Sequence, residues 1–272
     1  MSLSVLATPI GNLGDLSPRS REALASADFV AAEDTRVTRK LFTALGIPTP
    51  ELVSYREHGE ERRASTLVQR LLAGEDGVLV SDAGTPGVSD PGRFLVQACH
   101  AQGVEVHALA GPSASAAAIS VSGLAAAPFH FLGFPPRKGG PLRRWLVQFG
   151  QVPGALVLFE APSRTVATLQ AIAEIMPDRQ VCLCRELTKL HEEVKLASAA
   201  ELALMLSERE RVRGEVALVV GPGLPPKEES TTVEADAASL KSIAAVLAER
   251  WGVKKRTAYQ ALLKLEAELG QD

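Results

Sequence analysis

A loop rich in glycine, proline and aspartate is the segment of this sequence best suited to bind a small molecule. It runs from Ser81 to Gly92 and contains two aspartates, three glycines and two prolines. It follows Val78–Ser81, a predicted buried strand, and leads into a helix predicted at Pro91–Gln102. Open α/β sheets bind ligands beyond the carboxyl ends of their strands, where glycines permit close backbone approach and carboxylates bind hydroxyl or amino groups. The pattern favours a ligand-binding loop over a solvated double turn.

Two further loops lie between a predicted strand and a predicted helix. Pro9–Gly11 follows the strand Leu3–Ala7, and Gly111–Ala114 opens the small-residue helix Pro112–Gly123. Neither has the G-x-G-x-x-G pattern of dinucleotide-binding proteins or the G-K-[ST] ending of a P-loop. Backbone groups in such loops can contact a ligand. A plain turn at the first loop and close helix packing at the second are the alternatives.

Ionisable side chains that could move a proton follow two other predicted strands. Glu33 and Asp34 follow one, with Asp34 placed as a helix N-cap, and Glu186, Lys189 and His191 follow the other. His191 has no second histidine at metal-binding spacing, so we assign no metal site. Neither a G-x-S-x-G turn nor a Cys/His pairing indicates covalent catalysis.

Two groups of basic residues could contact an anion. Arg36, Arg39 and Lys40 share one face of the helix predicted at Thr35–Leu45, and Arg36 opposes the dipole at its start. Phosphate binding and a solvated charged face explain this pattern equally well.

The C-terminal segment resembles a helix-turn-helix, with Gly252 at the turn. Basic residues at the start of its second helix indicate contact with a nucleic-acid backbone, and a small packing domain is the alternative. These residues are Lys254, Lys255 and Arg256.

The elements that must position these residues indicate an α/β fold. In the first half strands alternate with helices, which predicts a mostly parallel sheet covered on both faces. The expected strands are Leu3–Ala7, Phe29–Ala32, Val78–Ser81 and Val104–Leu109, and the expected helices are Pro18–Ala27, Thr35–Leu45, Glu60–Leu72, Pro91–Gln102 and Pro112–Gly123.

A second α/β unit, with more antiparallel pairing than the first, is expected after one more strand at Phe129–Phe134 and a linker at Pro135–Pro141. A flexible tether is expected at Gly221–Ser230. The predicted domains are therefore residues 1–134, 135–225 and 226–272. In the second unit we expect strands at Ala155–Phe159, Gln180–Arg185 and Glu215–Val220, and helices at Ser163–Met176 and Ala199–Glu208.

Composition excludes several classes of protein. With 46% hydrophobic and 22% charged residues the chain is typical of globular proteins, and its apolar runs are too short and interrupted for a membrane span. We see no signal peptide, and three scattered cysteines argue against a disulfide framework. A cytoplasmic protein is expected. The net charge of −3 leaves nucleic-acid binding open, because local patches decide it.

Seven sequence features, taken in their order along the chain, indicate a protein family: ATPIGNLGDLSPR, AEDTR, SDAGTPGVSDPG, GPSA, FLGFPPRK, RELTKLHEE and the terminal basic helices. Together they resemble the tetrapyrrole-methylase superfamily over essentially the whole chain. Within it they are most similar to bacterial enzymes that methylate a cytidine ribose 2′-oxygen of 16S rRNA near the decoding centre (position 1402 in standard rRNA numbering). The resemblance implies a two-domain α/β fold, S-adenosylmethionine in the cleft between the domains, and usually a homodimer.

The resemblance also implies site residues by position. Ala161 and Thr165 depart from the Ser-Pro-His-Arg type of segment that relatives often carry. RNA phosphates would be held by Arg36, Arg39, Lys40, Arg137, Lys138, Arg143 and Arg144, with Lys254, Lys255 and Arg256 holding RNA outside the cleft. The cofactor pocket would be lined by Pro9, Ile10, Gly11, Asp82, Ala83, Gly84, Thr85, Pro86, Ser113, Ala114, Phe159, Glu160 and Ala217.

Methyl transfer to a ribose hydroxyl needs an in-line approach and removal of a proton late in the transfer. The candidate proton acceptors are Glu33, Asp34, Glu186, Lys189 and His191, in no order of preference. Two other functions are considered. The basic tail and the AEDTR segment argue against a methylase of precorrin-type tetrapyrroles, and the tail alone favours a nucleic-acid-binding regulator with a ligand-sensing α/β domain.

Overall fold

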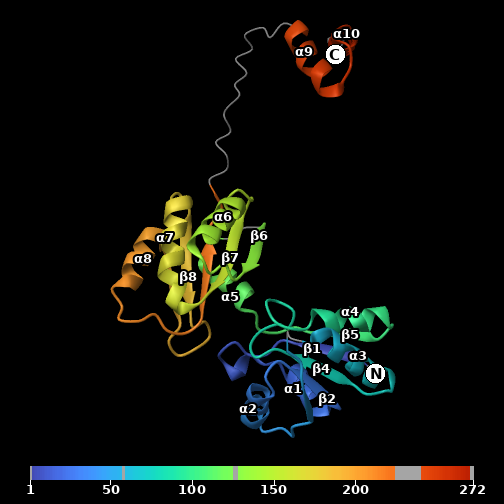
Figure 1. The fold of residues 1–272 in the computed structure, drawn as a ribbon, viewed down its shortest axis with the longest axis vertical. Coiled ribbons are helices and arrows are strands. Elements are labelled where there is room, and N and C mark those ends of the chain that lie inside the picture. The colour runs from blue at the N-terminus through green and yellow to red at the C-terminus, as the bar shows by residue number, and fades with distance from the viewer. Residues whose placement is uncertain (1, 57–58, 125–127, 224–239, 270–272) are drawn as a thin grey trace. The chain divides into compact units, whose positions relative to one another are not determined.

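The computed structural model describes residues 2–56, 59–124, 128–223 and 240–269. They fall into two compact units, Met1–Leu224 and Pro225–Asp272, which are described separately. The larger unit contains two five-stranded sheets (Figure 1). We call the part built on the first sheet, with helices α1 to α4, the first lobe. The second lobe is the part built on the second sheet, with helices α5 to α8.

The first sheet is entirely parallel and has the strand order β3-β2-β4-β1-β5. Every strand therefore ends at the same edge, where its following loop begins. The strands are β1 Ser2–Leu6, β2 Phe29–Ala32, β3 Glu51–Ser54, β4 Gly77–Val80 and β5 Glu105–Leu109. The helices are α1 Pro18–Ser26, α2 Thr35–Leu45, α3 Glu60–Leu72 and α4 Arg93–Ala101, with a short 3₁₀ turn, η1, at Leu13–Asp15.

Both faces of the first sheet are buried under helices, as the alternation of apolar residues requires. On one face Leu3 and Leu79 pack with Leu67 of α3 and Leu95 of α4. Leu6, Val30 and Val80 face the opposite side, where they pack with α1 and α2. The predicted two-faced parallel sheet is confirmed.

The second sheet has the order β6-β7-β10-β8-β9 and is mostly antiparallel, with only β6 and β7 parallel. Helices α6, α7 and α8 cover one face, and α5 packs against the other through small residues such as Ala118. Cys182 and Cys184 lie on the α5 face as buried free thiols, as expected. The elements are α5 Ala114–Ser122, β6 Phe129–Gly133, α6 Gly139–Gly150, β7 Ala155–Glu160, η2 Pro162–Arg164, α7 Thr165–Ile175, β8 Gln180–Arg185, β9 Glu193–Ser198, α8 Ala199–Ser207 and β10 Val216–Val220.

Three elements differ from the expectation. The segment predicted as a linker contains the start of α6, because Gly139, Gly140 and Pro141 occupy the first turn, where a missing N–H costs little. The edge strands β3 and β9 lie in segments for which we predicted neither a strand nor a helix. A boundary after residue 134 would assign β6 to the first domain, whereas β6 pairs with β7 in the second sheet.

The smaller unit contains two helices, α9 Leu240–Trp251 and α10 Lys255–Leu269. They are joined at Gly252, whose φ of 64° is in the left-handed region that glycine adopts without strain. Ala244 and Ala248 of α9 pack on Ala258 of α10. Lys254, Lys255 and Arg256 are exposed at the start of α10, as the pattern indicates. Most of the predicted tether lies outside the described residues.

Candidate functional site

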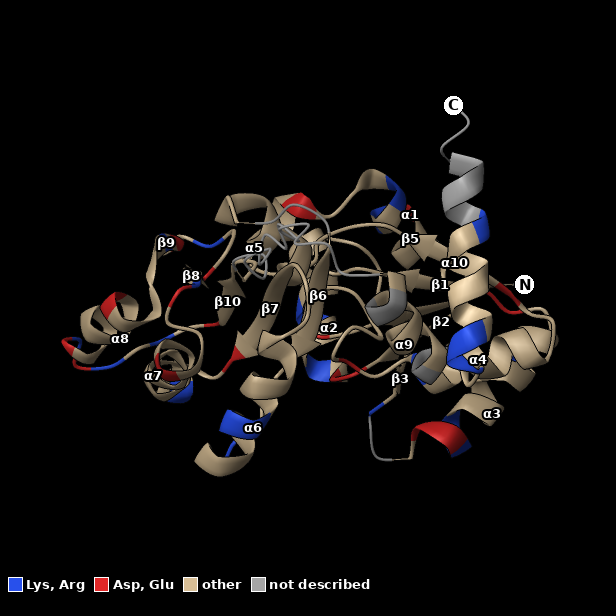
Figure 2. Ribbon diagram, turned by 90° about the horizontal axis from the view of Figure 1, so that it is seen from above, with Lys and Arg blue, Asp and Glu red and all other residues tan. Residues whose placement is uncertain are grey.

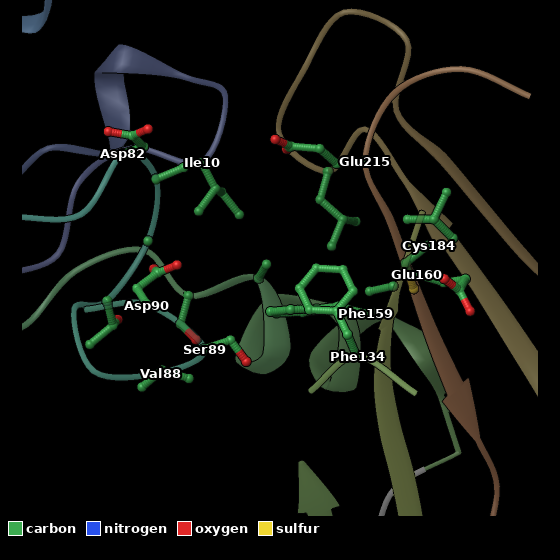
Figure 3. Close-up of a pocket in the computed structure, with 18 of the residues that line it drawn as sticks. Ile10, Asp82, Val88, Ser89, Asp90, Phe134, Phe159, Glu160, Cys184 and Glu215 are labelled. Atoms are coloured by element: carbon green, nitrogen blue, oxygen red, sulfur yellow. The ribbon is translucent and has the colours of Figure 1, made fainter. Parts of the chain in front are cut away.

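A cavity of about 390 Å³ lies at the carboxyl ends of the first sheet and is completed by strands and loops of the second lobe (Figure 3). Its size falls in the range of cavities that enclose small molecules, roughly 300–1,000 Å³. The first lobe contributes Ile10, Glu33, Asp82, Ala83, Gly84, Thr85, Val88, Ser89 and Asp90. The second contributes Ser113, Ala114, Phe134, Phe159, Glu160, Ala161, Pro162, Cys184, Leu187, Gly214, Glu215, Val216 and Ala217.

Hydrogen bonds hold three of the strand-end loops together. Thr8 and Gly84 exchange two backbone hydrogen bonds, with N···O distances of 2.8 and 3.0 Å. The Thr8 hydroxyl also donates to the carbonyl of Ser81 at 3.1 Å, and the Thr85 hydroxyl donates to the carbonyl of Pro112 at 3.2 Å. The loops after β1, β4 and β5 therefore form one rigid rim with little freedom to rearrange around a ligand.

Acidic side chains form the first-lobe wall of the cavity. Glu33 accepts the N–H of Asp82 at 3.1 Å, and Asp82 in turn accepts the N–H of Asp34 at 3.0 Å. Burial raises the pKa of both Glu33 and Asp82 above the ordinary values, with the charge of the other carboxylates adding to the effect at Glu33. Asp34 differs, because hydrogen bonds from Arg36 hold its pKa well below the usual range. This wall suits a cationic group of a ligand.

Asp90 is half-buried and faces the cavity near these carboxylates (Figure 3). Burial and, to a smaller extent, the charge of Glu33 together raise its pKa to about 6, although a hydrogen bond with Ser81 opposes the shift in part. It forms no ion pair with any described residue. The preceding Ser89 has a φ of 67°, a conformation that is uncommon outside glycine and costs about 1–3 kcal/mol. The backbone is thus strained immediately before Asp90, at a point where both residues line the cavity.

Aromatic rings from the second lobe form the opposite wall (Figure 3). Phe159 contacts Phe131 and Phe134 edge to face, with ring centroids 4.8 and 5.7 Å apart. Phe134 is 60% exposed, which places an apolar ring at the mouth of the cavity. An exposed ring of this kind can stack on a planar group of a ligand or keep water away from a bound one.

The loop between β8 and β9 contacts the first lobe through the stem of Lys189, whose ammonium a charged cluster of the second lobe holds in place. Lys189 Nζ donates to Glu186 Oε1 at 2.8 Å and to Glu215 Oε2 at 2.9 Å. Burial opposes the charged ammonium, but these two hydrogen bonds raise the pKa of Lys189 above its ordinary value. The aliphatic stem of Lys189 lies directly against Gly11, and Glu186 and Thr188 both adopt left-handed φ. We call this arrangement the Lys189 clasp.

We expect Gly11→Ala to disturb the clasp. An added Cβ would collide with Cγ of Lys189 and lie 2.9 Å from the Thr188 hydroxyl, so the β8–β9 loop would have to move. Overpacking of this kind costs about 1–3 kcal/mol, which denaturant unfolding would measure. Gly14→Ala is the control, because the new methyl group would meet only the exposed side chain of Asn12. Equal stability of the two variants would show that the clasp does not depend on Gly11.

The structure brings most of the predicted cofactor residues together around this cavity. The exceptions are Pro9, Gly11 and Pro86, which do not line it. Of the five predicted proton acceptors only Glu33 lines the cavity. Asp34 is paired with Arg36, Glu186 and Lys189 are paired with each other, and His191 is exposed and outside the cavity. Asp90 is one of the two aspartates of the predicted ligand-binding loop, but it was not among the predicted proton acceptors, because burial and neighbouring charge cannot be read from a loop motif.

The basic residues expected to contact RNA lie at several places on the surface. Arg36 is 80% exposed and is ion-paired with the N-cap Asp34, which offsets its unfavourable position at the helix start. Arg39 and Lys40 are exposed on α2 without ion pairs among the described residues. Basic residues also mark α6, which carries Arg143 and Arg144 (Figure 2).

Comparison with known proteins identifies the family. The model of the tetrapyrrole (corrin/porphyrin) methylases matches residues 2–203. This chain belongs to that family. Relatives named ribosomal RNA small subunit methyltransferase I are similar over nearly their whole length. The protein of Mycobacterium tuberculosis (strain CDC 1551 / Oshkosh) is 42% identical, with 97% of this chain and 95% of the relative covered. That of Synechocystis sp. is 39% identical, with 98% and 99% covered.

Solved structures confirm the family fold. A uroporphyrin-III C-methyl transferase from Thermus thermophilus, complexed with S-adenyl homocysteine, has a TM-score of 0.56 at 22% identity and covers 81% of this chain and 97% of its own. A diphthine synthase has a TM-score of 0.60 at 16% identity, with 81% and 90% covered. At these identities the likeness establishes the fold alone.

As a member of the methylase family, the chain is a methyltransferase whose cofactor is S-adenosylmethionine. The cavity fits this molecule chemically, because its acidic wall suits the positively charged sulfonium and ammonium groups and its apolar wall suits the adenine ring. Within the described ranges no three His, Cys, Asp or Glu side chains form a cluster that could hold a metal ion. Among the described helices none is long and apolar enough to span a membrane.

Proposed function

We propose that this protein methylates the 2′-oxygen of a cytidine ribose in 16S rRNA, near the decoding centre, with S-adenosylmethionine as methyl donor. The observation that carries the proposal is that relatives about 40% identical over nearly the whole chain are named small-subunit rRNA methyltransferases. The cavity at the strand ends, built from the loops whose motifs carry the resemblance, supports it. Action in the cytoplasm and assembly as a homodimer are part of the same proposal and rest on the resemblance.

The cofactor would be held by the rim of strand-end loops and by both walls of the cavity. S-adenosylmethionine supplies a methyl group on a positively charged sulfur, which an oxygen nucleophile can accept. Glu33 and Asp82 would attract the positive end, and the small residues Ala83, Ser113 and Ala114 leave room for close backbone contact. Phe134 and Phe159 would shield the reacting groups from water.

Asp90 is the residue we propose as the proton acceptor. A ribose hydroxyl becomes a competent nucleophile when a base removes its proton, and such a base works best when its pKa is near the working pH. Asp90 faces the cavity, has no cationic partner among the described residues and has a pKa of about 6. By contrast, the paired Lys189 stays protonated, and the paired Asp34 and Glu186 are weakened as bases because Arg36 and Lys189 lower their pKa values.

The RNA would be bound by basic residues around the cavity and on the smaller unit. These contacts neutralise phosphates and would make the affinity fall as salt rises. The proposed residues are Arg36, Arg39, Lys40, Arg137, Lys138, Arg143 and Arg144 on the larger unit, and Lys254, Lys255 and Arg256 on the smaller one.

The proposal is tested with small ribosomal subunits from a strain that lacks this protein. Incubation with the purified chain and labelled S-adenosylmethionine is expected to place label on a single ribose 2′-oxygen of 16S rRNA, located by nuclease digestion and mass spectrometry. Subunits from the parent strain are the control, because their site is already methylated and should stay unlabelled. Label on a base, or transfer only to a tetrapyrrole, would contradict the proposal.

A further inference from the structure

A second cavity, of about 320 Å³, lies beside the first and is lined by arginines. We call it the arginine cavity and define it by Arg137, Gly139, Arg143, Ser163, Arg164 and Gln170. Two short stretches of chain pass from one cavity to the other. Phe134 lines the first and Arg137 the second, while Glu160 lines the first and Arg164 the second. The Arg164 guanidinium donates to the carbonyl of Pro135 at 3.2 Å, which fastens the two stretches together.

The wall of the arginine cavity is cationic. No carboxylate of the described residues lines it, whereas three guanidinium groups do. Arg143 is paired with Glu174 and Arg164 with the buried Glu160, which fixes both guanidinium groups in position and offsets part of their charge. Arg137 is exposed and contacts no described residue through a hydrogen bond or ion pair. It therefore remains available for an anion from outside the chain.

The start of α6 adds neutral donors to this wall. Lys138, the N-cap residue, makes no hydrogen bond through its side chain, and Pro141 has no N–H to donate. The N–H groups of Gly139 and Gly140 are consequently unpaired among the described residues. A Cβ on Gly139 would meet no atom within 4 Å and its φ is not left-handed, so neither packing nor backbone conformation requires glycine there. Gly139 therefore leaves open space in the wall of the arginine cavity, where any other residue would place a side chain.

We propose that the arginine cavity binds a backbone phosphate of the RNA, next to the nucleotide whose ribose enters the main cavity. Planar guanidinium groups and helix-start N–H groups are the donors that phosphate oxygens accept. The position beside the main cavity fits a polymer that continues past the reacting sugar, which a free ligand does not do. This inference rests on the proposed function.

The test uses the full-length protein and two variants that remove different parts of the site. Arg137→Gln removes the free guanidinium, and Gly139→Ala fills the open space while placing a better helix former in α6. Both are expected to raise the Kd for methyl-free small subunits about 5- to 10-fold, with Kd for S-adenosylmethionine and melting temperature unchanged. Arg137→Gln should also reduce the slope of log Kd against log salt by the amount expected for the loss of about one phosphate contact. Arg211→Gln is the control, because Arg211 is exposed and lines neither cavity.

Each outcome decides the proposal. Unchanged RNA affinity in both variants would overturn the proposal. It would also be overturned if inorganic phosphate or free cytidine monophosphate bound as tightly as the subunit, because the arginine cavity would then be a site for a small anion. Kd is measured without the cofactor, so these results stand even if no methyl group is transferred. Failure of the wild-type protein to label the ribose would instead count against the proposed function.

Discussion

Replacing Asp90 by asparagine is expected to lower kcat by about 10²- to 10⁴-fold, with much smaller changes in KM for the RNA. The range is that of a general base removed from an enzyme, since asparagine has nearly the same shape but cannot accept the proton. The measurement is single-turnover methyl transfer to methyl-free small subunits at saturating S-adenosylmethionine. Asp178→Asn is the control, because that carboxylate is exposed and lies outside both cavities.

The pH profile separates a base from a residue that only shapes the loop. The active form of Asp90 is the carboxylate, and its pKa is raised to about 6, so wild-type kcat should fall as the pH drops through about 6. The Asp90→Asn variant should lack this acidic limb, the fall in kcat below about pH 6. Glu33→Gln keeps an oxygen for the N–H of Asp82 but removes a charge that raises the pKa of Asp90, so the limb should move to lower pH. A wild-type profile that is flat across this range would contradict the assignment.

Removing the carboxylate of Glu160 is expected to be the most destabilising single change near the site. This side chain is fully buried and accepts three hydrogen bonds: from the N–H of Ala161 at 2.7 Å, Arg164 Nε at 2.7 Å and the Thr168 hydroxyl at 2.6 Å. Glu160→Ala leaves the three donors without their acceptor, and breaking a buried pair from one side costs about 3–5 kcal/mol. The melting temperature should fall by about 10 °C in calorimetry.

An exposed ion pair between a glutamate and an arginine provides the control for the stability effect of Glu160→Ala. Glu174 is ion-paired with Arg143, but both side chains are more than half exposed, so Glu174→Ala should cost no more than about 1 kcal/mol. A double variant that removes Glu160 and Arg164 together should be less destabilised than the sum of the single changes, because no charge is left unpaired. Equal losses in Glu160→Ala and Glu174→Ala would contradict the structural role of the buried pair.

The sequence was informative about the first lobe because local pattern and tertiary structure agree there. The apolar runs of β1, β2 and β4 and the caps of α2 all pointed to one arrangement, and parallel strands bring their following loops to one edge. The exposed and half-buried strand β3 lacks a comparable apolar run, and β9 mixes charged with apolar residues. Glycine and proline at the start of α6 have the composition of a break, although the first turn of a helix tolerates them.

The site was less predictable than the fold, since its chemistry depends on which side chains meet. The motifs correctly located the loops around the cavity, but no spacing rule shows that Arg36 pairs with Asp34 or that Lys189 is held by Glu186 and Glu215. Asp90 gains its raised pKa from burial and from Glu33, a residue far away in the sequence. The arginine cavity likewise forms only because α6 and α7 lie side by side.

The Lys189 clasp has a consequence for how the enzyme meets its ligands. One side chain rests on Gly11 of the first lobe while two carboxylates of the second lobe hold its ammonium, so the lobes are joined beside the cavity. Both hydrogen bonds lie within the second lobe, so they fix the position of Lys189 and would move with that lobe. The side chain is therefore already ordered where it meets Gly11. Its conformational entropy is lost during folding, before any ligand arrives, so ligand binding does not have to order it again.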